Sequence, residues 1–215
     1  MPLLLDNLTR KMQSYQPQQL VSDMPEAAVL LAITSGKKPE IILTRRTSHL
    51  KSHPGQVAFP GGKRDAEDFD LYATALREAK EEIGLNPQQV QPLGALSDVV
   101  SLHGIKVTPY VALVPEKLDF CLCEDELDAI FQVPISWLLE DPRSHTDVIQ
   151  VADTKLYVPS YSFNEFTIWG LSAIMLVEFL QVGFNMPIDI YQPPKGKLLQ
   201  RPLRPLPVFN FRNNQ

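Results

Sequence analysis

The clearest pattern of apolar and polar positions lies between residues 70 and 84, and it predicts a helix. Apolar side chains recur there at helical spacing, so one stripe of the helix should face a core. The stripe consists of Tyr72, Ala75, Leu76, Ala79 and Ile83. Asp70 is a suitable N-cap, and Gly84 is suited to end the helix in a left-handed conformation.

Shorter apolar runs predict the rest of the architecture. Residues 2–15 have the pattern of an amphipathic helix, and residues 173–180 predict a second, more uniformly apolar helix. The predicted strands cover residues 27–34, 41–44, 91–100, 105–114 and two segments within 147–160. Together these elements indicate an α/β domain with a mixed sheet between helices.

Changes in composition divide the chain into three parts. Residues 1–26 form the N-terminal helix and a linker, residues 27–186 form the main domain, and residues 187–215 form a proline-rich basic tail. The prolines of the tail disfavour regular structure, and we expect its cations, Arg201 among them, to face no acids. The sequence leaves open whether the tail packs on the surface, pairs with a neighbour or is disordered.

Three glutamates gather on one face of the predicted helix beside its apolar stripe. Glu78, Glu81 and Glu82 repel one another at this spacing, and they lie near the negative end of the helix dipole. Arg77 precedes Glu81 by four residues, which is the weaker order for such a pair. Taken alone, the cluster is equally consistent with a solvated face, but close hard oxygen ligands suit Mg²⁺ or Mn²⁺.

The residues around this helix resemble the Nudix box of the Nudix hydrolases, which cleave nucleoside diphosphates linked to another moiety. Gly61 and Gly62 form a glycine turn, an acidic loop follows, and residues 77–85 match the right half of the box position for position. The left half departs twice, because Asp68 replaces the expected Glu and the spacer before Arg77 is one residue longer.

The resemblance implies a Nudix-type α/β/α sandwich with a mixed β-sheet. It also implies metal-dependent hydrolysis, with Glu78 and Glu82, and Glu81 as a further candidate, as metal ligands and catalytic residues. Arg77 would orient the glutamates. Glu81 or an acid of residues 124–126 would take the proton from the attacking water.

Residues 43–46 and 50–62 are similar to the signature of the coenzyme A pyrophosphatase branch of this family. That branch usually has Arg at the position of Lys51, and its spacing accounts for the longer spacer. The resemblance implies that coenzyme A or an acyl derivative is hydrolysed to 3′,5′-ADP and 4′-phosphopantetheine. Arg46, Lys51 and His53 are then candidates to bind the substrate phosphates, and Gly61 and Gly62 are further candidates for substrate binding. Taken alone, the three basic residues are equally consistent with a solvated loop.

The amino-acid composition restricts the binding partners and the cellular compartment that we expect. The net charge of −5 gives no reason to expect a nucleic-acid polymer as partner. Two cysteines are too few for a disulfide framework. The chain shows no run long enough to span a membrane and no secretory signal, so we expect a cytoplasmic protein that acts on a small molecule as a monomer or homodimer.

Two alternatives remain open. One is a Nudix hydrolase for ADP-ribose, a dinucleoside polyphosphate or another nucleoside diphosphate-linked substrate. The other is a non-catalytic sensor with the same fold, which would have no need of all three glutamates.

Overall fold

The computed structural model describes residues 2–49, 54–151 and 153–201 of the 215-residue chain. It contains two sheets and four α-helices in the described ranges. The helices are α1 (Pro2–Ser14), α2 (Leu71–Ile83), α3 (Ile135–Leu138) and α4 (Gly170–Phe184), with one 3₁₀ turn at Pro87–Gln89.

The main sheet has the strand order β3-β2-β1-β7-β5; in addition, β4 pairs with β1, β6 with β7 and β8 with β2. Its strands are β1 (Glu26–Thr34), β2 (Glu40–Arg46), β3 (Val57–Ala58), β4 (Gly61–Lys63), β5 (Gln91–Ala95), β6 (Val99–Val100), β7 (Lys106–Val114) and β8 (Leu127–Pro134). β1 and β7 run parallel, whereas β1 and β2 run antiparallel. The prediction of a mixed sheet is therefore confirmed.

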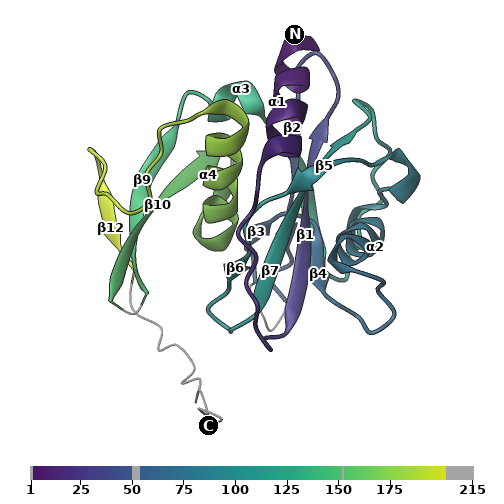
Figure 1. Cartoon of the computed structure of the whole chain (residues 1–215), viewed down its shortest axis with the longest axis horizontal. Coiled ribbons are helices and arrows are strands. Elements are labelled where there is room, and N and C mark those ends of the chain that lie inside the picture. The colour runs from purple at the N-terminus through teal and green to yellow at the C-terminus, as the bar shows by residue number, and fades with distance from the viewer. Residues whose placement is uncertain (1, 50–53, 152, 202–215) are drawn as a thin grey trace.

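Helices cover both faces of the main sheet (Figure 1). One face packs on α2 through a cluster that includes Ala75, Ala79 and Ile83. The other face packs on α1 and α4, and the fully buried Leu8 and Met12 of α1 belong to this second cluster. The α/β sandwich is confirmed, and α1 shares the core of the main domain; the division of the chain at residues 26 and 186 stays a prediction.

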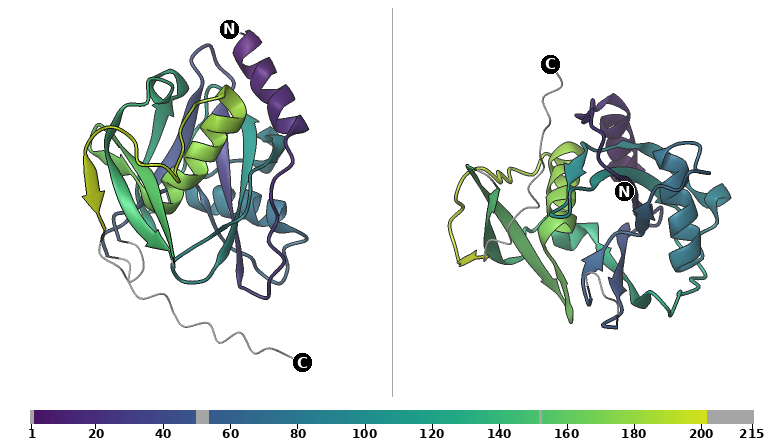
Figure 2. Two further views of the ribbon diagram at one scale, coloured as in Figure 1. Left: turned by 60° about the vertical axis from the view of Figure 1, so that its left-hand side comes forward. Right: turned by 90° about the horizontal axis from the view of Figure 1, so that it is seen from below.

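A second sheet lies beyond α4, as Figure 2 shows. It has the order β11-β10-β9-β12 and consists of β9 (Arg143–Val151), β10 (Thr154–Phe163), β11 (Phe166–Ile168) and β12 (Leu198–Gln200). β9 and β10 form the antiparallel hairpin that the sequence predicted within residues 147–160, with longer strands. None of the helices in the described ranges is long and apolar enough to cross a membrane.

Helix α2 has the predicted bounds. The Ala73 N–H donates to Asp70 Oδ1 at 2.7 Å, which caps the first turn. Gly84 follows the last turn with a φ of 72°, and its N–H donates to the Lys80 carbonyl at 3.0 Å. Glycine adopts this left-handed conformation without steric strain, so the helix ends there. The position of every side chain on α2 is thus fixed by local sequence.

The tail differs from its prediction in one respect. β12 pairs in parallel with β9, and the Arg201 guanidinium donates to both carboxylate oxygens of Asp147, at 2.8 and 3.1 Å. Asp147 is fully buried, and Arg201 also lies over the Trp169 ring at 4.6 Å. The expectation that Arg201 faces no acid is wrong, because a buried carboxylate on a distant strand needs a counter-charge.

Candidate functional site

Arg77 lies at the centre of the acidic face of α2. Its Nε and Nη2 donate to the two oxygens of Asp68, both at 3.0 Å. Its Nη1 donates to Glu78 Oε1 at 2.9 Å and to Glu81 Oε2 at 3.1 Å, and its Nη2 also donates to the Lys63 carbonyl. One guanidinium therefore joins the acidic loop, β4 and two of the three glutamates, and its planar fork fixes their relative positions.

Asp68 holds Arg77 in place from the loop before the helix. Its side chain is only 6% exposed, and it also accepts hydrogen bonds from the Asp65 N–H and the Thr74 hydroxyl, each at 2.9 Å. The hydrogen bonds from Arg77 hold the pKa of Asp68 well below its usual range. Asp68, which stands where the Nudix pattern has Glu, thus still forms a bidentate pair with Arg77.

Glu82 is the buried member of the cluster, at 5% exposure. Its Oε2 accepts the Gly61 N–H at 2.9 Å. Burial raises the pKa of Glu82 to about 7, and the charges of Glu78 and Glu126 act in the same direction. The Gly61 hydrogen bond and the charge of Arg46 oppose this rise. In the metal-free protein, Glu82 is therefore only partly ionised at neutral pH.

The two glycines of the turn give the glutamates room. A Cβ on Gly62 would lie 2.4 Å from Glu78 Cδ, inside the carboxylate. Gly61 has a φ of 154°, and a Cβ there would lie 2.3 Å from the Ala28 carbonyl oxygen. The turn therefore brings backbone against Glu78 and Glu82 as no other residue type allows. That Gly61 and Gly62 also contact substrate stays a prediction.

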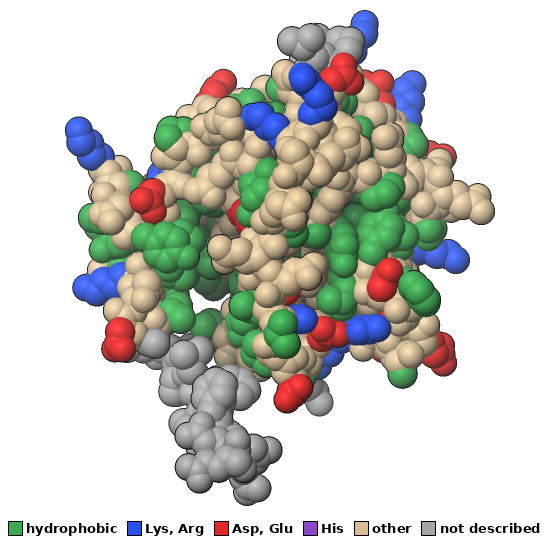
Figure 3. Space-filling view, in the orientation of Figure 1, with side chains coloured by type: hydrophobic (Ala, Val, Ile, Leu, Met, Phe, Trp, Pro, Cys, Tyr) green, Lys and Arg blue, Asp and Glu red, His purple; other side chains and the backbone are tan. Residues whose placement is uncertain are grey.

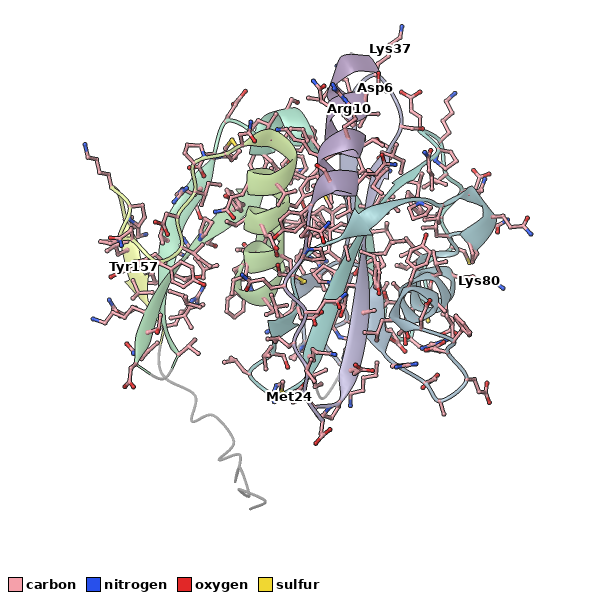
Figure 4. All side chains as sticks on the ribbon, in the orientation of Figure 1. Asp6, Arg10, Met24, Lys37, Lys80 and Tyr157 are labelled. Carbon is pink, nitrogen blue, oxygen red and sulfur yellow. The ribbon has the colours of Figure 1, made fainter. Side chains whose placement is uncertain are left out.

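The three glutamates differ in environment. The side chain of Glu78 is 17% exposed, and burial raises its pKa, with Arg77 opposing the shift. Glu81 is 59% exposed and lies at the rim. Lys80 projects from the opposite side of α2, away from the sheet (Figure 4), so it does not neutralise the cluster. Glu78 and Glu82 are thus the partly and fully buried acids of the site.

Arg46, at the end of β2, brings a second cation to the site. Its Nη1 lies 4.0 Å from Glu126 Oε2, and its charge lowers the pKa of Glu82. The charge of Glu126 raises the pKa of both Glu78 and Glu82. Of the three acids at residues 124–126, Glu126 is therefore the one whose charge acts on these two glutamates. The sequence left these three acids open, since only the pairing of β2 with β8 distinguishes them. The predicted phosphate ligands Lys51 and His53 lie outside the described residues.

The donors of this site suit a hard divalent cation by chemistry. In the ranges that the structure describes, no three His, Cys, Asp or Glu side chains are grouped closely enough to hold a metal ion as they stand. Arg77 and the Gly61 N–H engage one oxygen each of Glu78 and Glu82. Carboxylate oxygens are preferred ligands of Mg²⁺ and Mn²⁺, and a cation would offset the burial of two like charges. The residues therefore fit such an ion.

Charges of both signs are interspersed over the face seen in Figure 3. On that face the Lys and Arg side chains do not merge into a broad basic surface. Binders of nucleic-acid polymers usually present such a surface. This face therefore adds nothing in favour of a polymer as partner.

Comparison with known proteins gives concordant matches. The sequence model described as "NUDIX domain" matches residues 24–151. A protein of Enterobacter sp. (strain 638), named "Uncharacterized Nudix hydrolase NudL", is 38% identical over 188 residues, which cover 85% of this chain and 97% of that protein. A protein of the same name from Salmonella typhimurium is 38% identical over 185 residues, covering 84% and 96% of the two chains.

One solved structure is similar over most of the chain. It is the crystal structure of a MutT/nudix family protein from Enterococcus faecalis, with a TM-score of 0.50 and 16% identity. The match covers 83% of this chain and 68% of that chain. At this identity the similarity concerns the fold.

The raised pKa of Glu82 predicts how stability depends on pH in the absence of divalent ions. The raised pKa keeps a proton on Glu82 up to about pH 7 in the folded protein, whereas the unfolded chain releases it near 4.5, the ordinary pKa of a glutamate. The folded state binds more protons at Glu82 between these values, so the contribution of this group to stability is fully present below pH 4.5 and is lost as pH rises to 7. The shift corresponds to roughly 3 kcal/mol. Urea unfolding in EDTA at several pH values measures it.

The matched variant is Glu82→Gln, which removes the titrating group and keeps the shape. Its free energy of unfolding should lack this part of the pH dependence, and at pH 7 it should equal or exceed that of wild type. A variant whose pH profile overlays that of wild type would show that Glu82 is ionised at little cost in the fold.

Proposed function

The chain belongs to the Nudix family and is a Nudix hydrolase, and from that premise we propose that it hydrolyses the pyrophosphate bond of coenzyme A or an acyl-coenzyme A. Nudix hydrolases act on nucleoside diphosphate-linked substrates and generally use divalent metal ions. The proposal concerns which member of that substrate class this enzyme takes and which residues do the work.

The observation that carries the proposal is the placement of residues 43–46 and 55–62, which resemble the signature of the coenzyme A branch. β2 and β3 pair antiparallel, with Arg45 opposite Val57, so the two halves of the signature lie side by side. The second half continues into Gly61, whose N–H donates to Glu82. The residues that resemble the branch are therefore part of the wall around the buried glutamate, where they would contact a substrate.

In the proposed reaction, a water displaces one phosphate from the other in line. Addition of water across the P–O–P bond yields 3′,5′-ADP and 4′-phosphopantetheine, or its acyl derivative. We assign Glu78 and Glu82, with Glu81 at the rim, to holding Mg²⁺ or Mn²⁺. The bound ion would lower the pKa of the water and offset charge on the diphosphate oxygens.

The remaining roles follow from charge and exposure. Arg77 is a positioning residue, because all its hydrogen bonds among the described residues go to protein groups around the site. Arg46 would bind a substrate phosphate together with Lys51 and His53. Its Nε has no hydrogen-bond partner among the described residues, which leaves a donor for that purpose. Glu81 and Glu126 are the candidates for the general base, since both are exposed acids beside Glu78.

Side-by-side turnover tests the substrate. With Mg²⁺ or Mn²⁺ we expect kcat/KM for coenzyme A to exceed that for ADP-ribose and for a diadenosine polyphosphate. Glu82→Gln, assayed in parallel, should lower kcat by more than about a hundredfold, or roughly 2.7 kcal/mol in the barrier, because the ligand loses its charge. Faster turnover of ADP-ribose or the dinucleotide would replace coenzyme A as the substrate and leave the enzyme class unchanged.

The two adjacent arginines of β2 provide a matched pair of variants. Arg46→Ala should raise KM for coenzyme A about tenfold with a smaller change in kcat, as expected for lost ground-state binding. Arg45→Ala should leave both constants within about twofold, because Arg45 forms a partly exposed ion pair with Asp128 at 2.6 Å, and such pairs contribute little. A fall in kcat for Arg46→Ala at unchanged KM would assign Arg46 to the glutamates instead of the substrate.

A further inference from the structure

A pocket of about 370 Å³ is lined by Thr47, the residue that follows Arg46. One wall is formed by residues 47–49, which follow β2, and the other by side chains from residues 122–128. The two walls are joined where the Thr47 N–H donates to the Glu126 carbonyl at 2.9 Å. Arg46 and Glu126, whose side chains are 4.0 Å apart, precede the lining residues Thr47 and Leu127 in the chain, and the charges of both act on the buried Glu82.

The size of the pocket suits one half of a dinucleotide-like substrate. Sites for whole small molecules occupy about 300–1,000 Å³, and this pocket lies near the lower end of that range. A substrate cleaved at its centre, beside Arg46, would extend in two directions from the diphosphate. One half has room in the pocket, and the other must lie outside it.

The charge of the described lining favours a half that carries no additional phosphate. Glu124 and Asp128 both line the pocket, and none of its described lining residues is Lys or Arg. The nearby Arg45 is held by Asp128. Asp128 is therefore paired, and Glu124 is the carboxylate of the described lining left to repel a phosphate and to accept hydrogen bonds from N–H and O–H donors. A neutral group with such donors is the favoured occupant.

The remaining lining points to a flexible chain with methyl groups and amides. Leu122 and Leu127 give the wall apolar surface. The Thr47 hydroxyl is buried without a hydrogen-bond partner among the described residues, so an amide of a bound ligand would satisfy it. His49 supplies the only ring in the described lining, which is a poor platform for stacking adenine.

We propose that this pocket binds the pantetheine arm of the substrate, and that the 3′-phosphorylated adenosine lies outside it. The arm is neutral, and it carries two amides and a hydroxyl beside a pair of methyl groups, which matches the Glu124 carboxylate, the Thr47 hydroxyl and the two leucines of the described lining. This inference rests on the proposed function, because it takes coenzyme A as the substrate. It adds that the pantetheine half of coenzyme A lies on the pocket side of Arg46 and that the adenosine half lies on the other side.

To test this proposal, one exposed residue on each wall of the pocket is replaced by tryptophan, whose side chain would occupy the pocket. Ser48 and Glu124 are exposed residues of opposite walls, so Ser48→Trp and Glu124→Trp should each block the pocket without disturbing the core. Ser35→Trp, at an exposed serine in the β1–β2 turn, is the matched control. The readout is the inhibition constant of each product, 4′-phosphopantetheine and 3′,5′-ADP, against coenzyme A turnover in Mg²⁺, on variants whose thermal unfolding matches wild type.

We expect the constant for 4′-phosphopantetheine to rise about tenfold in Ser48→Trp and Glu124→Trp, while that for 3′,5′-ADP stays within about twofold. The control should change neither. A rise confined to 3′,5′-ADP would assign the pocket to the nucleotide and overturn the inference, as would no change in either constant. In both cases wild-type turnover of coenzyme A leaves the proposed function intact. If wild type does not hydrolyse coenzyme A, the proposed function fails and this inference fails with it.

Discussion

The site depends on one guanidinium shared among three carboxylates. Arg77 bonds Asp68 through two nitrogens and reaches Glu78 and Glu81 through the third. Without it, Glu78 and Glu81 would lose their counter-charge, and the loop before α2 would be held to the helix only by the weaker bonds of Asp68 and Asp70 to its first turn. Because the fork is planar and always charged, it fixes both the loop and the rim of the site at any pH at which the protein folds.

The second constraint is burial. Glu82 is packed against the backbone of the glycine turn, where burial and the neighbouring charge of Glu78 both favour its protonated form. Among the described residues, Arg77 forms no hydrogen bond or ion pair with Glu82, so it does not offset the cost of burying this carboxylate. The fold therefore holds one carboxylate that gains most from a divalent cation, next to a second that is partly buried and already oriented. On the proposed assignment, binding of a divalent cation would offset the cost of burying these two carboxylates.

The sequence predicted the features whose cause lies within one segment of the chain. It missed features that depend on contacts between distant segments. The caps at Asp70 and Gly84, and the apolar stripe between them, lie within one segment, so α2 was predicted with its observed bounds. β8 was not predicted, because most of its side chains are half-buried and show no alternation. Arg201 was misjudged, since its partner Asp147 lies 54 residues away on a strand whose burial arises only from the tertiary fold.

The same distinction applies within the site. The three glutamates could be found from helical spacing, whereas the choice of Glu126 among three adjacent acids required the pairing of Arg46 with Leu127 across β2 and β8. Asp68 appeared in the sequence only as a departure from a pattern. Its bidentate bond to Arg77 follows from how the loop folds back on the helix, which no spacing rule contains.

The most direct measurement is a crystal structure of the protein with Mn²⁺, with the ion located by its anomalous scattering. We expect a peak within coordination distance, about 2.0–2.3 Å, of carboxylate oxygens of both Glu78 and Glu82, with Arg77 still bonded to Asp68. A Mn²⁺ site held by other residues, or none at these glutamates while the enzyme turns over in the same ion, would contradict the assignment.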